Sequence, residues 1–126
     1  MDIRSVYLIV IAVALFPIAL SYGAAPHVSL SFLFGIEGIT LNEVHIFRAV
    51  MGLYLATLIF WICGAFIASI RTAALWSLVV FMLGLAAGRL FSLMMDGGPS
   101  QLLIIYLVLE IICAVLGLAL LAKKAP

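Results

Sequence analysis

Arg89 and Glu110 are ionisable residues inside apolar runs that are long enough to cross a membrane, residues 72–95 and 100–122. A charged side chain at membrane depth costs about 2.5 to more than 10 kcal/mol, depending on the reference state, so such a residue is a functional-site candidate by default. A guanidinium binds carboxylates and other polar headgroups, and a carboxylate can pair with it or titrate. The chemistry that these two residues offer is therefore ion pairing, headgroup binding or proton transfer.

The two side chains are expected to converge. At 1.5 Å per residue, Arg89 lies about 10 Å and Glu110 about 15 Å below the outer membrane interface. Helical side chains lean toward the N-terminus of their own helix, and the helix of Arg89 begins on the opposite side of the membrane from the helix of Glu110. The side chains of Arg89 and Glu110 are therefore expected to point toward each other. Asp96, two turns beyond Arg89, is expected to lean toward it as well.

The composition places these residues in a polytopic membrane protein. The chain has 126 residues, of which 68% are hydrophobic and only 9% charged, whereas soluble domains carry about 25% charged residues. We predict an all-α fold over residues 1–126, a single integral membrane domain built as a four-transmembrane-helix bundle with up-down-up-down topology. The expected spans are residues 5–22, 45–70, 72–95 and 100–122, and residues 23–44 are expected to form an apolar loop on the outer interface or a lid.

The charged residues indicate the orientation. The positive-inside rule puts Lys and Arg in the cytoplasm, so both termini are expected to be cytoplasmic. The residues on that side are Arg4, Arg71, Lys123 and Lys124, and those on the other side are Glu37, Glu43 and Asp96. The net charge of +1 and the absence of a basic run give no sign of a nucleic-acid partner.

Small and polar residues follow one stripe on each of three helices, and the residue numbers of successive positions differ by three, four or seven. We expect the stripes to meet at a shared polar centre in the outer leaflet and so predict a ligand-binding pocket there. Arg48 could also reach the headgroups or pair with Asp96. The stripes are His45, Arg48, Gly52, Ala56 and Cys63; Gly84, Gly88, Ser92 and Asp96, with Arg89 at the edge; and Tyr106, Glu110, Cys113 and Gly117. The predicted ligand-binding residues are Arg48, Arg89, Glu110, Tyr106, Asp96 and His45.

Plainer interpretations of the same residues stay open. The Arg89 and Glu110 pair could serve only to fix which helices are neighbours, and Gly84 with Gly88 could mark simple close packing in the bundle or at an oligomer seam. Cys63 and Cys113 lie in apolar runs, where a free cysteine behaves as a small hydrophobic residue. No spacing typical of a metal site is present, and no cofactor is assigned.

Several segments resemble an uncharacterised family of small bacterial four-helix integral membrane proteins, catalogued as domain of unknown function 4345. The most specific is the string His-x-x-Arg-Ala-x-x-Gly-x-Tyr between His45 and Tyr54. The likeness covers residues 33–36, 42–54, 60–61, 64–66, 77–84, 88–90, 96–97 and 106–110. A remoter similarity links the four-span pattern to DoxX-type membrane subunits.

The resemblance implies a multi-pass protein of the bacterial inner (cytoplasmic) membrane and carries no established activity. It emphasises five of the same positions: His45, Arg48, Arg89, Asp96 and Glu110. Three hypotheses follow for function: binding of a small amphipathic ligand such as a lipid or quinone, a structural subunit of a membrane complex, or a membrane enzyme or proton-coupled carrier that uses Glu110. Whether any reaction is catalysed stays open, and so no catalytic residue is assigned. Because a bundle of this size has little interior, we expect a homo-oligomer or a membrane-complex subunit surrounded by membrane lipids.

Overall fold

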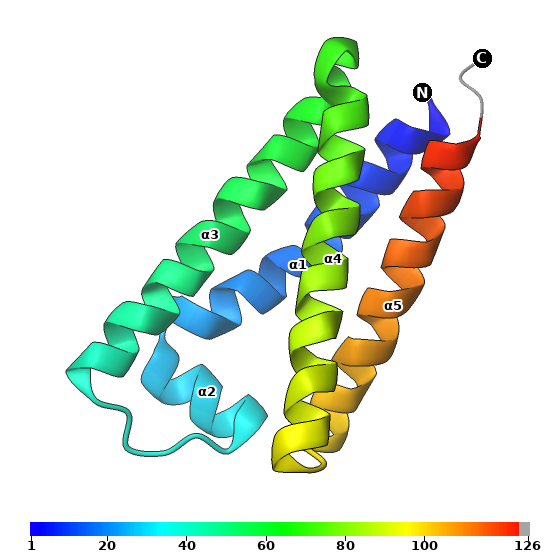
Figure 1. Ribbon diagram of the computed structural model, residues 1–126. Coiled ribbons are helices and arrows are strands. Elements are labelled where there is room, and N and C mark those ends of the chain that lie inside the picture. Colours follow the sequence, from blue (N-terminus) through cyan, green and yellow to red (C-terminus); the bar gives the residue numbers. More distant parts are fainter. Residues whose placement is uncertain (124–126) are drawn as a thin grey trace.

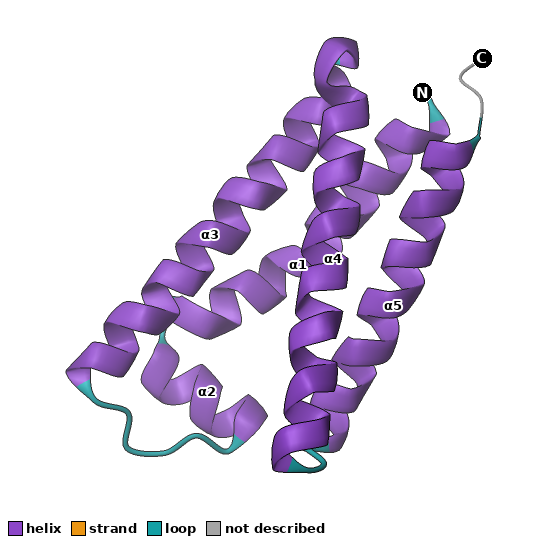
Figure 2. Cartoon of the chain, in the orientation of Figure 1, coloured by secondary structure: helices purple, strands orange, loops and turns teal. Residues whose placement is uncertain are grey.

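The computed structural model describes residues 1–123, so Lys124, which contributed to the predicted orientation, lies outside the described residues. The described chain is all-helical, with five helices and no strand (Figure 2). Four of the helices are long and apolar enough to cross a membrane. The bounds are α1 Ile3–Gly23, α2 Pro26–Phe34, α3 Leu41–Phe66, α4 Ala68–Asp96 and α5 Gln101–Ala122.

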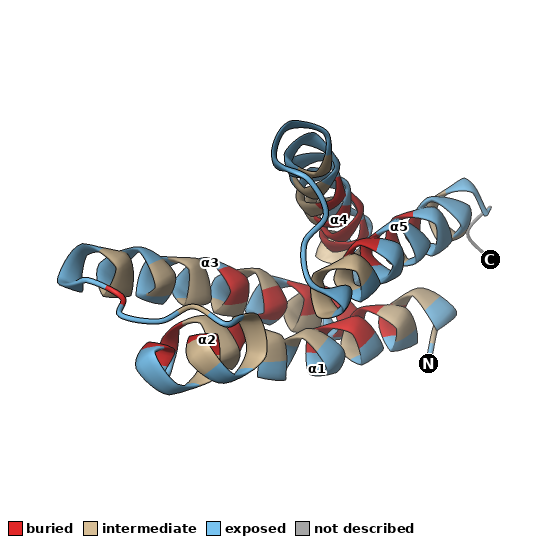
Figure 3. Cartoon of the chain, turned by 90° about the horizontal axis from the view of Figure 1, so that it is seen from below, coloured by how far each residue is buried: buried red, intermediate tan, exposed pale blue. Residues whose placement is uncertain are grey.

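The four long helices run alternately up and down, which confirms the predicted fold class (Figure 1). The chain begins and α5 ends beside the turn between α3 and α4, and we call this the termini end of the bundle. Helix α2 and the turn between α4 and α5 lie at the opposite end, which we call the loop end. The long helices α3 and α4 meet near the termini end and separate toward the loop end (Figures 1 and 3).

Residues 23–44 were predicted to form a loop, but they contain helix α2. Pro26 is at the first position of this helix, where its missing N–H costs nothing and its fixed φ suits the helix. Gly35 ends it in the left-handed conformation at φ 68°, and its amide donates to the carbonyls of Leu30 and Ser31. These start and stop signals flank a segment of only nine residues, so its helical pattern was too short to stand out against the surrounding loop residues.

The hairpin between α3 and α4 also differs from the prediction. Helix α3 begins at Leu41 rather than residue 45, because Thr40 and Glu43 form a capping box that satisfies backbone amides of the first turn. It ends at Phe66 rather than residue 70, and α4 begins at Ala68 rather than residue 72. Only Ile67 separates the two helices.

The core lies where α1, α3, α4 and α5 face one another (Figure 3). Trp61 is fully buried and its indole Nε1 donates to the hydroxyl of Ser77 at 2.9 Å. Small residues allow the helices to approach: a Cβ at Gly117 would lie 2.6 Å from Cγ2 of Val79, and a Cβ at Gly64 would overlap the Cβ of Ala74. This tight contact fixes the positions of α4 and α5, the helices that carry Arg89 and Glu110.

Candidate functional site

Arg89 and Glu110 form an ion pair between α4 and α5, as the direction of the two side chains predicts. Nε of Arg89 donates to Oε1 of Glu110 at 2.8 Å and to Oε2 at 3.1 Å. The Glu110 side chain is 9% exposed and that of Arg89 is 22% exposed. Among the described residues, the terminal nitrogens of the guanidinium bind no carboxylate or carbonyl oxygen, and the hydroxyl of Tyr22 lies beside the guanidinium. The pair therefore uses one of the three guanidinium nitrogens and leaves four N–H donors for another acceptor.

The other three arginines have a different role. Each donates to carbonyl oxygens at the C-terminus of a helix, where backbone acceptors are left over and the helix dipole favours a cation. The acceptors are Leu120 and Lys123 for Arg4, Gly23 for Arg48, and Gly64 and Ala65 for Arg71. Arg89 differs from them because it holds a carboxylate inside the bundle.

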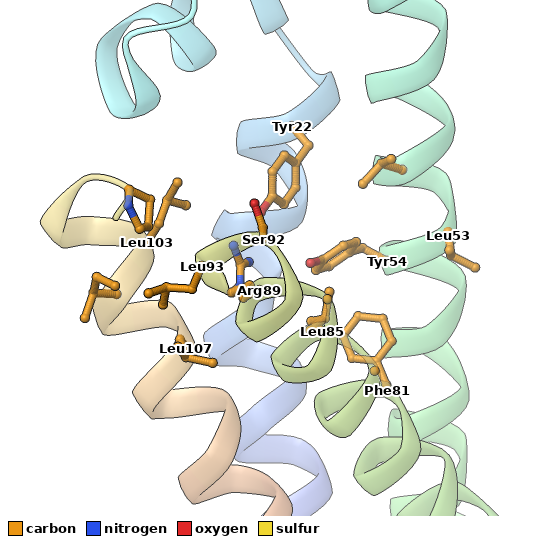
Figure 4. Close-up of a pocket in the computed structure, with 15 residues that line it drawn as sticks. Tyr22, Leu53, Tyr54, Phe81, Leu85, Arg89, Ser92, Leu93, Leu103 and Leu107 are labelled. Atoms are coloured by element: carbon orange, nitrogen blue, oxygen red, sulfur yellow. The ribbon is translucent and has the colours of Figure 1, made fainter. Parts of the chain in front are cut away.

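Arg89 lines a cleft of about 530 Å³ toward the loop end, which lies mainly between α3 and α4 and is closed on other sides by Tyr22 of α1 and by residues of α5. In Figure 4 the hydroxyls of Tyr22 and Tyr54 point toward the Arg89 guanidinium, and leucine and phenylalanine side chains form much of the remaining wall. On the α4 side, Gly84 and Gly88 line the cleft, and a Cβ at either position would meet nothing within 4 Å. The two glycines therefore keep the cleft open rather than packing against another helix of this chain.

A second pocket of about 290 Å³ lies on the other side of the ion pair, between α1, α4 and α5. Arg89, Tyr54 and Leu85 line both this α1–α5 pocket and the α3–α4 cleft. Glu110 and Tyr106 line the α1–α5 pocket, and most of its remaining wall is aliphatic. The ion pair thus lies between two largely apolar cavities.

Aromatic side chains join the site to α2. The guanidinium carbon of Arg89 lies 5.6 Å from the centre of the Tyr106 ring, a favourable cation–π distance. Phe34 at the end of α2 packs edge-on against Tyr106, with ring centres 6.3 Å apart, and is stacked on Tyr22 at 5.9 Å. Through Phe34, α2 contacts both the tyrosine beneath Arg89 and the tyrosine that lines the cleft.

Arg89, Glu110 and Tyr106 come together, whereas the other three predicted site residues lie apart from them. The predicted approach of Asp96 to Arg89 is wrong, because Asp96 is at the exposed end of α4 and accepts a hydrogen bond from Ser92 at 2.8 Å. Pairing with Asp96 was one of two alternatives for Arg48, and the structure instead has Arg48 donating to the carbonyl of Gly23 at 2.9 Å. His45 is exposed near the start of α3.

The inward face of α3 differs from the predicted stripe. Gly52 and Ala56 are exposed, whereas Tyr54, Leu58 and Trp61 are at most 5% exposed. A spacing of four and then three residues joins the buried positions, but Gly52 and Ala56 on the opposite face are also four residues apart, so spacing does not choose between the faces. The predicted stripe followed the small residues, because small residues are enriched where membrane helices pack. Tyr54 and Tyr22 were therefore not among the predicted site residues.

Fold and site together define a small four-span helical membrane protein with a partly buried arginine that is paired with a glutamate of the next helix. The model of the family described as "Domain of unknown function (DUF4345)" matches residues 3–121, and the chain belongs to that family. No curated protein and no solved structure matches the chain.

Proposed function

We propose that this protein binds a small amphipathic molecule, lipid-like or quinone-like, and that Arg89 anchors the polar head of that molecule. One observation carries the proposal: Glu110 uses only Nε of Arg89, and the guanidinium borders the α3–α4 cleft with the Tyr22 hydroxyl beside it. A hydrogen bond to a charged group is worth more than one between neutral groups, so a ligand oxygen that reaches the terminal nitrogens would be stabilised. An arginine serving only to pair α4 with α5 has no need of this opening.

The shape of the cavities supports an amphipathic ligand rather than a wholly polar one. Beside Arg89, Tyr22 and Tyr54, the cleft is lined mainly by residues such as Leu53 and Phe81. Sites for small molecules are commonly apolar clefts of 300–1,000 Å³ with a few polar groups that fix orientation. The α1–α5 pocket extends the apolar surface beyond the ion pair and gives room for a hydrocarbon chain.

The location is also part of the proposal. Arg4, Arg71 and Lys123 gather at the termini end, and Glu37 and Asp96 at the loop end. By the positive-inside rule the termini end would face the cytoplasm of a bacterial cell, with the bundle in the inner membrane. The cleft would then open in the outer leaflet, where a membrane-dissolved ligand enters sideways.

Native mass spectrometry of the protein released from membranes tests the binding function, with extraction and identification of any retained mass. The decisive variant is Gly88→Leu, because Gly88 lines the cleft and has open space around an added Cβ, so a leucine would project into the cleft and leave both members of the ion pair unmutated. The matched control is Gly52→Leu, since Gly52 is also an open helical glycine but lines neither cavity. We expect the retained mass in wild type and Gly52→Leu and its loss in Gly88→Leu. Wild-type protein without any ligand, or equal occupancy in all three proteins, would overturn the proposal.

A structural role in a membrane assembly is the second candidate. The observation that favours it is the exposed stripe of Gly84 and Gly88 on α4, because small residues of this spacing let a second helix approach closely. The protein would then be a homo-oligomer or a subunit of a complex. In that case Gly88→Leu would change the mass of the complex seen in the same spectrum rather than the occupancy of a small ligand.

A further inference from the structure

We infer that the headgroup bound at Arg89 is uncharged and presents a carbonyl oxygen, as in a ketone, an ester or a quinone, rather than a phosphate, sulfonate or carboxylate. This inference rests on the proposed binding function and specifies its ligand class. It follows from the charges of the side chains that line the two cavities.

The cavities are charge-balanced. Among the described residues that line them, Arg89 is the one cation and Glu110 the one anion. These two charges are 2.8 Å apart at their nearest atoms and cancel. An uncharged ligand leaves the buried site neutral, whereas an anionic ligand would leave one net negative charge in a low-dielectric interior.

The geometry of the pair strengthens this discrimination. Glu110 occupies Nε of Arg89, so a ligand oxygen on the terminal nitrogens lies across the same planar guanidinium, roughly 6–8 Å from the nearest carboxylate oxygen, since a hydrogen bond lies on each side of the group. Two negative charges at that separation repel strongly when little water lies between them. A carbonyl oxygen would accept the same hydrogen bonds with far less repulsion.

The remaining polar groups of the cleft also suit an acceptor. The hydroxyls of Tyr22 and Tyr54 point toward the guanidinium from two other helices (Figure 4). A phenolic hydroxyl can donate, and so one of these hydroxyls can join a terminal nitrogen of Arg89 on the two lone pairs of one carbonyl oxygen. Two donors then hold the carbonyl, and the ligand needs no formal charge to be held.

Two photoreactive probes with the same alkyl chain and the same diazirine test this, one ending in a methyl ketone and the other in a sulfonate. Both are added to the wild-type protein in nanodiscs of zwitterionic phosphatidylcholine, which has no net charge, and labelling is read by mass spectrometry. We expect the ketone probe to label at least tenfold more strongly than the sulfonate probe. Labelling by the ketone probe should be lost in Gly88→Leu and kept in Gly52→Leu.

Glu110→Gln supplies the matched change of charge. Glutamine has nearly the shape of glutamate and keeps a carbonyl oxygen for Nε of Arg89, but the site then carries one net positive charge. We expect labelling by the sulfonate probe to rise at least tenfold in this variant, while labelling by the ketone probe changes by less than about threefold.

The outcomes separate the two claims. Preference of the wild-type protein for the sulfonate probe, abolished by Gly88→Leu, would overturn the inference and leave the binding function standing. Labelling that Gly88→Leu does not reduce, with either probe, would overturn the binding function and the inference with it. The wild-type comparison decides the inference even if Glu110→Gln fails to fold.

Discussion

Nε of Arg89 binds both carboxylate oxygens of Glu110, at 2.8 and 3.1 Å, while the two terminal nitrogens of the same guanidinium face a cleft. An arginine that forms a two-pronged pair with a carboxylate uses two nitrogens side by side, whereas here one nitrogen does the pairing. The contact joins α4 to α5 and still leaves the guanidinium able to bind a ligand. A structural role and a binding role are therefore compatible in one residue.

The ion pair gives the first prediction. Arg89→Leu should destabilise the protein by about 3–5 kcal/mol, because it leaves the buried Glu110 charge without a partner. The double variant Arg89→Leu with Glu110→Leu should recover most of that loss, since two apolar residues of similar volume replace the pair. The free energy of unfolding of the three proteins, measured by SDS titration in mixed micelles, checks this.

The same double variant separates structure from binding. If the ion pair acts only to hold α4 and α5 together, the stable double variant should retain every property of the wild type. We expect it instead to be folded and to lose the retained ligand, because the anchoring guanidinium is gone. If the double variant were as unstable as Arg89→Leu, the two charges would not be neutralising each other inside the bundle.

The two tryptophans give the second prediction. Trp61 is fully buried in the core, whereas Trp76 is 50% exposed on the outer surface of α4. Trp61→Ala removes a large buried ring and the hydrogen bond to Ser77, so it should cost about 3–5 kcal/mol of unfolding free energy. Trp76→Ala is the matched control and should change the same measured free energy by less than about 1 kcal/mol. Equal effects would show that the inward face of α3 is assigned wrongly.

The sequence was sufficient to predict the four spans and the meeting of Arg89 with Glu110. The four spans follow from the length of the hydrophobic runs. The meeting of Arg89 with Glu110 follows from the depth of each residue along its helix and from the direction in which helical side chains lean. Both are properties of single helices and need no knowledge of how the helices pack.

The positions of Arg48, Asp96 and Tyr54 could not be predicted in the same way, because each depends on which face of a helix turns inward. In a soluble protein the apolar face of a helix marks the core. In a membrane both faces of α3 are apolar, so hydrophobicity does not show which face turns toward the other helices. Arg48 donates to the carbonyl of Gly23 at the end of α1, and a contact with a backbone group of another helix cannot be predicted from residue types. Helix rotation and such contacts between distant segments are fixed only by the packed bundle.

Arg4 gives the third prediction. Its guanidinium donates to the carbonyls of Leu120 and Lys123 and so links the start of α1 to the end of α5. Arg4→Leu should loosen the last turn of α5 and cost about 0.5–1.5 kcal/mol, because it removes the side-chain hydrogen bonds to these carbonyls. Amide hydrogen exchange of residues 119–123 should become faster in this variant. Lys123→Leu is the control, because it keeps the carbonyl that Arg4 uses, and it should leave the exchange rates of residues 119–122 nearly unchanged.

The glycines give the fourth prediction, which also tests where the helices are in contact. A Cβ at Gly64 would collide with the Cβ of Ala74 on α4, so Gly64→Ala should lower the free energy of unfolding by about 1–3 kcal/mol. Gly84 has nothing within 4 Å of such a Cβ, and Gly84→Ala should raise the free energy by roughly 0.5–1 kcal/mol through the better helix propensity of alanine. SDS titration of both variants at low protein concentration measures the two changes. Destabilisation by Gly84→Ala that grows with protein concentration would instead place Gly84 in a contact between copies of the chain, since only an intermolecular contact responds to concentration in that way.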